Sequence, residues 1–226
     1  MANRCLLYYI TDRSQFRGDE GARRSALVAK VAEAASAGVD YVQLREKDLS
    51  ARELEILARD ALAAAHNSAP LKTENRELRT RLLINSRTDV ALAVGADGVH
   101  LRADDVAPPE VRQMLELYDR WPVAADHFLV AASCHTAANA LRAASGKADF
   151  AVFAPVFGKS NAAGTQPTGL AGLREACRAE IPVLALGGIT IENAASCLEA
   201  GAAGVAGIRL FQDNKIENVV RELRAL

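Results

Sequence analysis

The stretch from Tyr41 to His66 reads YVQLREKDLSARELEILARDALAAAH: a short apolar run, a charged connection and a long segment of helical period. The run Tyr41–Arg45 is typical of a β-strand, and residues 51–66 repeat apolar side chains at helical spacing. Ser50, three residues before Glu53, is the capping-box signature of a helix start. The stretch therefore predicts one strand followed by one helix.

The same alternation runs through the whole chain in both directions from this unit. The expected strands are Leu6–Thr11, Tyr41–Arg45, Leu82–Asn85, Gly98–Leu101, Phe128–Ser133, Phe150–Val156, Pro182–Gly187 and Gly204–Arg209. The expected helices are 23–37, 51–66, 88–94, 108–117, 136–144, 168–178, 191–200 and 216–225, with Thr190 as a further helix cap. The strands are nearly continuous apolar runs, as in parallel sheets that are covered on both faces.

Eight strand–helix pairs in 226 residues predict an α/β protein with a single-domain TIM (β/α)8 barrel. A doubly wound open sheet is the main competing fold, and it usually carries a G-x-G-x-x-G turn after its first strand. The first strand here runs instead into Thr11-Asp12-Arg13-Ser14, which favours the barrel. Residues 67–80 are polar and longer than a usual connection, so we expect a solvated excursion on the face away from the active site.

Composition narrows the classes of function. The 27 Lys and Arg residues nearly balance 28 Asp and Glu residues, giving a net charge of -1, which argues against nucleic acid as the main partner. A hydrophobic share of 50% excludes a disordered chain. No apolar run approaches the roughly 20 residues that span a bilayer, and no signal-peptide core follows the N-terminus. We expect a cytoplasmic protein without membrane contact, with buried thiols at its four scattered cysteines, and a homo-oligomer is compatible with this composition.

The carboxyl ends of barrel strands build the active site of this fold. After the second strand, alternation places Gln43, Arg45 and Lys47 on one side, where a guanidinium and an ammonium suit a phosphate or diphosphate. Asn85 ends the third strand, and the fourth gives His100 and Arg102. The alternative is an ion-paired strand end without function.

Three further strand ends carry polar or glycine-rich sequence. The loop residues Asp104 and Asp105 suit Mg²⁺, which prefers one or two carboxylates plus substrate phosphates, although adjacent acids also occur in plain turns. Ser133 and His135 suit anion binding or proton transfer, with a helix cap and a structural histidine as the alternative. Gly187-Gly188 ends the seventh strand, where backbone N–H groups of this fold frequently bind phosphate.

Taken in order, these motifs resemble the thiamine phosphate synthase family, which includes the thiazole tautomerases, over nearly the whole chain. The motifs that carry the resemblance are Tyr9-Ile10-Thr11-Asp12, Gln43-Leu44-Arg45-Glu46-Lys47, Leu83-Ile84-Asn85, Gly95-Ala96-Asp97-Gly98-Val99-His100-Leu101, Ser133-x-His135-Thr136, Ala148-Asp149-Phe150, Pro155-Val156-Phe157, Gly187-Gly188-Ile189 and Gly201-Ala202-Ala203-Gly204-Val205.

The resemblance implies a Mg²⁺-dependent transferase that joins a hydroxymethylpyrimidine diphosphate to a thiazole phosphate, giving thiamine phosphate and diphosphate. It implies that Gln43, Arg45, Lys47, Asn85 and Ser133 hold the pyrimidine diphosphate and that Asp105 binds Mg²⁺. It places the thiazole phosphate at Gly187, Gly188, Ile208 and Arg209. Arg45, Lys47, Ser133 and His135 are the candidate catalytic residues.

The chain departs from the family pattern at three functional positions. Ser86 stands where the family usually has a second aspartate for Mg²⁺, and Arg209 replaces a small polar residue. Residues 158–166 replace a Pro-Thr-x-Thr-Lys loop, so we expect Lys159, with Ser160 and Asn161, to take over diphosphate binding. A thiazole tautomerase that uses His135, and a phosphate-binding barrel without turnover, are the alternative functions.

Overall fold

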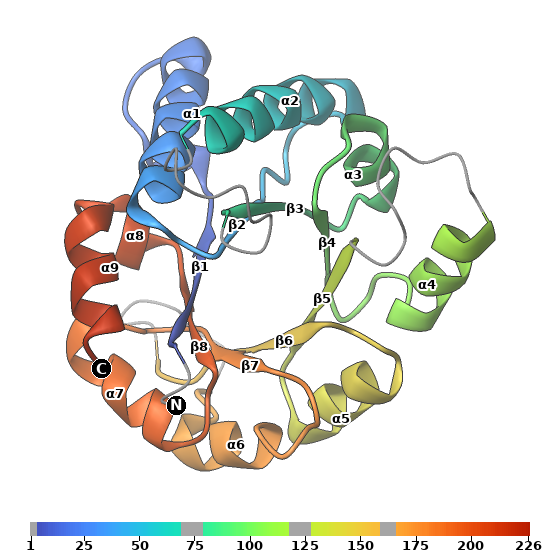
Figure 1. Cartoon of the computed structure of the whole chain (residues 1–226), viewed down its shortest axis with the longest axis vertical. Coiled ribbons are helices and arrows are strands. Elements are labelled where there is room, and N and C mark those ends of the chain that lie inside the picture. Colours follow the sequence, from blue (N-terminus) through green and yellow to red (C-terminus); the bar gives the residue numbers. More distant parts are fainter. Residues whose placement is uncertain (1–3, 69–78, 118–127, 159–165) are drawn as a thin grey trace.

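The computed structural model describes residues 4–68, 79–117, 128–158 and 166–226. The described strands form one closed parallel barrel in chain order, in which β8 pairs with β1 (Figure 1). The strands are β1 (Leu6–Ile10), β2 (Tyr41–Leu44), β3 (Arg81–Asn85), β4 (Gly98–Leu101), β5 (Leu129–Cys134), β6 (Phe150–Phe153), β7 (Val183–Ala185) and β8 (Gly204–Gly207). The predicted TIM barrel is confirmed.

Helices cover the outside of the barrel in Figure 1. They are η1 (Arg13–Gln15), α1 (Glu20–Ala37), α2 (Ala51–Asn67), α3 (Thr88–Val94), α4 (Pro108–Leu117), α5 (Ala137–Ser145), α6 (Gly169–Ala176), α7 (Ile191–Glu199), α8 (Arg209–Gln212) and α9 (Ile216–Arg224). The predicted caps are present: Ser50 and Glu53 form a capping box, and the Thr190 side chain caps α7. None of the described helices combines the length and the apolar character that a bilayer crossing requires.

The expected eighth strand is too long. β8 ends at Gly207, and Arg209 begins the short helix α8. Tertiary contacts hold this extra turn, because the buried Phe211 ring packs 5.9 Å from the Tyr9 ring and Gln212 accepts a hydrogen bond from the Tyr9 hydroxyl. The sixth strand is also shorter than expected and ends at Phe153. Residues 69–78, most of the expected excursion, lie outside the described part of the chain.

The barrel interior is filled by side chains rather than open, as is usual for this fold. The buried residues Tyr8, Ile10, Leu83, Ala131, Phe150, Val152, Leu184 and Ala206 form this inner cluster. The Tyr8 ring lies 5.9 Å from the Tyr41 ring and 5.5 Å from the Phe150 ring, edge to face in both pairs. These aromatic contacts hold Tyr8 in one place inside the barrel, below the strand ends.

Candidate active site

A cavity of about 940 Å³ opens at the carboxyl ends of the strands. All eight strands or the loops that follow them contribute to its wall, as the fold predicts. It is lined by every predicted site residue of the described chain except Asp105: Gln43, Arg45, Lys47, Asn85, Ser133, His135, Gly187, Gly188, Ile208 and Arg209. Lys159, Ser160 and Asn161 lie outside the described residues.

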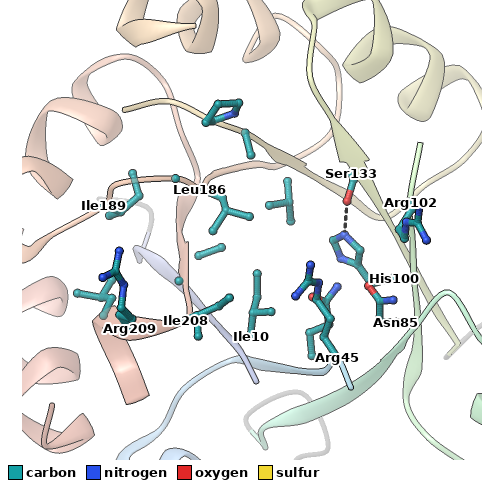
Figure 2. Close-up of a pocket in the computed structure, with 18 of the residues that line it drawn as sticks. Ile10, Arg45, Asn85, His100, Arg102, Ser133, Leu186, Ile189, Ile208 and Arg209 are labelled. Carbon is teal, nitrogen blue, oxygen red and sulfur yellow. Dashed lines mark hydrogen bonds between the residues drawn. The ribbon is translucent and has the colours of Figure 1, made fainter. Parts of the chain in front are cut away.

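Arg45 is the half-buried cation at one end of the cavity, close to Asn85 and His100 in Figure 2. Its guanidinium makes no hydrogen bond or ion pair with the residues that the structure describes, so its donors are available to a ligand. Its backbone N–H donates to the Thr11 hydroxyl at 3.0 Å, which ties this strand end to β1. A guanidinium held in this way suits the oxygens of a phosphate group.

A buried ion network below Arg45 fixes the direction of the β2 loop. Glu46 accepts hydrogen bonds from the Thr11 hydroxyl at 2.6 Å and from the Arg13 guanidinium at 3.1 Å. Arg13 also contacts both oxygens of Asp48, at 2.7 and 2.8 Å. These carboxylates raise the pKa of Arg13, although burial opposes the shift. The Glu46 side chain is held among buried groups on this side of the strand end, whereas its neighbours Arg45 and Lys47 line the cavity.

Gln43 presents a buried donor that lacks an acceptor. The residue is 2% exposed, and its Nε2 has no hydrogen-bond partner among the described residues. A buried polar group of this kind costs free energy unless a ligand or water satisfies it. Since Gln43 lines the cavity beside Arg45, its amide suits a ring nitrogen or another acceptor on the heterocycle of a substrate.

Ser133 and His100 meet on the cavity wall, where Ser133 Oγ lies 2.8 Å from His100 Nε2 (Figure 2). On the other side of the imidazole, Nδ1 lies 3.1 Å from the hydroxyl of Tyr8. Burial, and secondarily the charge of Arg45, lowers the pKa of His100 to about 3. The imidazole is therefore neutral at physiological pH.

His135 reaches the cavity from the loop that follows β5. Its Nδ1 lies 2.7 Å from the carbonyl oxygen of Ala154, which can only accept a hydrogen bond. Nδ1 therefore donates its proton to this carbonyl, and Nε2 makes no hydrogen bond to the described residues. This is the arrangement of a general base facing a cavity.

The opposite end of the cavity is built from glycine backbone. Gly187 and Gly188 have φ values of 98° and 65°, and a Cβ at either position would lie within 3.0 Å of Pro155 or Phe157. The pair leads into α7, whose N-terminus supplies free backbone N–H groups and a positive dipole end. Arg209 lies at the same end and is exposed, and its guanidinium contacts no side chain among the described residues.

The two cationic ends face each other across an apolar wall. Figure 2 shows Arg209 and Ile189 on one side and Arg45, Asn85 and His100 on the other, with Ile10, Leu186 and Ile208 between them. Such a cavity suits two flat apolar rings that meet in the middle and carry their anionic groups at the outer ends.

Comparisons with known proteins agree with this geometry. The family model described as thiamine monophosphate synthase matches residues 7–211. The chain belongs to the thiamine monophosphate synthase family. Among its relatives, a putative thiamine-phosphate synthase 2 of Aquifex aeolicus is 38% identical over 206 residues, which cover 91% of this chain and 96% of the relative. A thiamine-phosphate synthase of Syntrophomonas wolfei is 37% identical over 225 residues, covering 97% and 95%.

A solved structure from the same family has the same fold. The thiamine phosphate pyrophosphorylase from Pyrococcus furiosus superposes with a TM-score of 0.75 at 28% identity, covering 99% of this chain and 95% of the other. Family and relatives together identify the activity as thiamine-phosphate synthesis, a transferase reaction of thiamine biosynthesis.

Of the positions at which the chain departs from the usual family pattern, Ser86 has a defined local structure. Ser86 adopts a left-handed φ of 62°, and its hydroxyl lies 3.0 Å from Asn85 Nδ2, which donates to it. Asp105 is half-buried, and its carboxylate accepts the backbone N–H of Arg102 at 2.7 Å. Its neighbour Asp104 lines the cavity and pairs with the Arg102 guanidinium at 2.6 Å. Of these two neighbouring carboxylates, Asp104 lines the cavity and Asp105 does not.

Reasoning from the sequence missed several contributors to the site. His100 was visible as a strand-end residue, but nothing local revealed its contacts with Tyr8 and Ser133. Arg13 followed the first strand without any signal that it would be buried among acids. The apolar wall residues Ile10, Leu186 and Ile189 also line the cavity. Alternation along β1 could have indicated Ile10, whereas Leu186 and Ile189 follow the end of β7.

Proposed function

We propose that the two ends of the cavity bind the two substrates of thiamine-phosphate synthesis, a pyrimidine diphosphate at Arg45 and a thiazole phosphate at Gly188. The observation that carries this proposal is the pair of cationic ends separated by apolar side chains. The wall between them accommodates two heterocycles in contact, and the charges at its ends match the anions that these substrates carry.

At the first end, Arg45, Lys47, Asn85 and Ser133 bind the diphosphate, and the Gln43 amide binds the pyrimidine ring. Arg45 offers a planar fork of donors, and Lys47 offers a point charge, so together they match adjacent phosphate groups. Gln43 is suited to the ring because its buried Nε2 needs an acceptor.

At the second end, the backbone of Gly187 and Gly188, the start of α7 and the Arg209 guanidinium bind the thiazole phosphate. Gly188 is open to the cavity, and its φ of 65° turns the chain into α7. Ile208 packs against the ring on the apolar wall. Arg209 adds a charge that a small polar residue at this position does not supply.

The reaction breaks the bond between the pyrimidine methylene carbon and the diphosphate oxygen, and the oxygen keeps the electron pair. The methylene carbocation then accepts the lone pair of the thiazole nitrogen, which forms the new C–N bond. No protein nucleophile is required. Arg45 and Lys47 stabilise the charge that develops on the leaving diphosphate, and fixed charges of this kind are usually the largest source of rate enhancement.

A Mg²⁺ ion is expected at the diphosphate end, and the residues on the rim fit it. Among the described residues, no group of three His, Cys, Asp or Glu side chains that could hold a metal ion comes together. Mg²⁺ commonly binds through one or two carboxylates and completes its shell with substrate phosphates and water. Asp105, with Asp104 beside it, would hold the ion, which when bound neutralises charge on the diphosphate.

A second candidate function is thiazole tautomerisation, favoured by one observation. His135 Nδ1 donates to Ala154, so Nε2 is free to accept a proton from a substrate in the cavity. This activity needs only the thiazole phosphate end of the site.

The test is an assay of the purified full-length protein with both precursors and Mg²⁺, with thiamine phosphate quantified after oxidation to its fluorescent thiochrome. Product that requires both precursors supports the synthase, and His135→Ala should then retain most of the activity. Absence of product, together with His135-dependent conversion of a thiazole carboxylate phosphate, would replace the synthase with the tautomerase.

A further inference from the structure

A chain of three hydroxyl and imidazole groups runs from the barrel interior to the cavity. The Tyr8 hydroxyl lies 3.1 Å from His100 Nδ1, and His100 Nε2 lies 2.8 Å from Ser133 Oγ. Tyr8 is fully buried, His100 is 3% exposed, and Ser133 lines the cavity. The chain links strands β1, β4 and β5, and its outer end is the group that a substrate meets.

The protonation states of the inner groups are settled by their surroundings. Burial raises the pKa of Tyr8 well above its ordinary value, so the phenol keeps its proton. Burial also keeps His100 neutral, so its ring carries one N–H and one bare nitrogen. The direction of both hydrogen bonds, from Tyr8 through His100 to Ser133, therefore depends on which ring nitrogen holds the proton.

The Tyr8 hydroxyl decides between the two tautomers. A buried O–H requires an acceptor, and His100 Nδ1 is the acceptor that the described chain places within hydrogen-bond distance of it. The Gln43 amide also lies near the phenol, but its Nε2 is a donor, and the described residues show no hydrogen bond from the Tyr8 hydroxyl to its oxygen. Nδ1 must then be bare, which puts the imidazole proton on Nε2, facing Ser133.

The His100 tautomer sets the direction of the Ser133 hydroxyl in the cavity. If Nε2–H donates to Ser133 Oγ, the serine cannot give its own proton to the histidine, and that proton is directed to a ligand. This reverses the polarity of a nucleophilic serine–histidine pair, in which the histidine withdraws the serine proton.

We propose that Tyr8 and His100 are positioning residues that hold Ser133 as a hydrogen-bond donor toward the diphosphate of the pyrimidine substrate. The identity of the acceptor rests on the proposed function, whereas the direction of the hydrogen bonds does not. A donor held in advance stabilises the charge that grows on the leaving group without having to reorient during the reaction. The packing of Tyr8 against Tyr41 and Phe150 keeps the inner end of the chain in place.

The direction of the Tyr8–His100–Ser133 hydrogen bonds can be measured without an activity assay. Long-range ¹H–¹⁵N correlation spectra of the full-length protein with ¹⁵N-labelled histidine, assigned by comparison with His100→Gln, report which ring nitrogen is protonated. We expect a protonated Nε2 and a bare Nδ1 in the wild type, and loss of this preference in Tyr8→Phe. A wild-type spectrum with the proton on Nδ1 would overturn the proposal, even if the enzyme is fully active.

The coupling to catalysis is tested by a double-mutant cycle. Ser133→Ala should lower kcat on the order of 100-fold, the effect of removing one donor to a developing charge, and Tyr8→Phe at least about tenfold. The double variant should be no slower than Ser133→Ala alone, because Tyr8 acts through Ser133. Independent, multiplying effects, or an unchanged kcat in folded Tyr8→Phe, would contradict the proposal.

Two further variants separate positioning from general damage to the barrel. Tyr9→Phe is the matched control, because it also removes a buried hydroxyl from β1, the one that donates to Gln212 at 3.0 Å, on the opposite face of the strand. Tyr9→Phe should lose stability and keep kcat.

In His100→Gln the side-chain amide can still donate to Ser133, so kcat should exceed that of His100→Ala. An equal loss of kcat in the two His100 variants would count against His100 as the donor to Ser133. If the wild type makes no thiamine phosphate, the proposed function fails, and the spectra alone decide the inference.

Discussion

Arg13 and Glu46 form a buried ion pair between the ends of the first two strands, with 3.1 Å between Nη1 and Oε2 and side chains only 7% and 2% exposed. The same guanidinium contacts Asp48 and Glu20, so one arginine organises three carboxylates. Through Glu46 and Asp48 it holds the two residues that flank Lys47. A charge of this kind is costly to leave without its partner.

Arg13→Ala is therefore expected to lower the free energy of unfolding by about 3–5 kcal/mol, the usual cost of breaking a buried ion pair. Urea unfolding measures the change. The control is Arg24→Ala, which removes more exposed contacts with Glu20 and Glu53 and should cost about 1 kcal/mol or less. Equal losses in the two variants would show that the Arg13 network contributes no more than a surface pair.

Arg45→Ala and Lys47→Ala should each reduce turnover about 100-fold or more, because each removes charge that stabilises the leaving diphosphate. Steady-state kinetics with varied pyrimidine diphosphate measure this effect. Arg52→Ala, on the exposed start of α2, is a matched loss of positive charge outside the cavity and should have little effect. An unchanged kcat/KM in both cavity variants would remove the diphosphate from this end.

Arg209→Ala should raise KM for the thiazole phosphate about tenfold or more, as expected for loss of a hydrogen bond between charged groups. KM for the pyrimidine diphosphate should stay within a factor of about two, because the two ends of the cavity are separate. Arg209→Lys should recover part of the affinity. If both KM values rise together, Arg209 supports the cavity as a whole rather than one substrate.

Asp105→Asn should raise the Mg²⁺ concentration for half-maximal activity about tenfold, because it removes a carboxylate charge from the expected ion site. The amide oxygen can still accept the Arg102 N–H, so the turn should be preserved. Titration of activity with Mg²⁺ at saturating substrates measures the change. Asp104→Asn is the paired variant: a larger shift there than in Asp105→Asn would move the principal ligand to the residue that lines the cavity.

Acidification should destabilise the fold in part through His100. Its pKa of about 3 in the folded state lies below the ordinary value of 6.5, because burial disfavours the charged ring. The unfolded chain therefore binds the extra proton first, and stability is lost as the pH falls from about 6.5 toward 3. His100→Gln removes this ionisation while the other three histidines remain.

Urea unfolding of both proteins between about pH 7 and pH 4.5 tests this expectation. The stability advantage of the wild type over His100→Gln should shrink steadily as the pH falls. A difference that stays constant over this interval would mean that His100 titrates alike in the folded and unfolded chain.

Local patterns determined the architecture and the location of the site. The run Tyr41–Arg45, the Ser50–Glu53 cap and the helical repeat of 51–66 are read over a few neighbouring residues, and their recurrence predicts the barrel. Once strands are parallel, their carboxyl ends meet at one face, so Arg45, Asn85, Ser133 and Gly188 could be placed at one cavity before any contact was known.

Only the tertiary structure decided which groups are in contact and which protonation state each buried group has. Tyr8 and His100 are 92 positions apart and Arg13 and Glu46 are 33 apart, so no local pattern records either contact. The bare Gln43 donor and the α8 turn at Arg209 likewise depend on what packs around them. The physical reason is that burial and hydrogen bonding are set by the sum of distant neighbours. Periodicity along the chain reveals which way a side chain points, but not what it meets there.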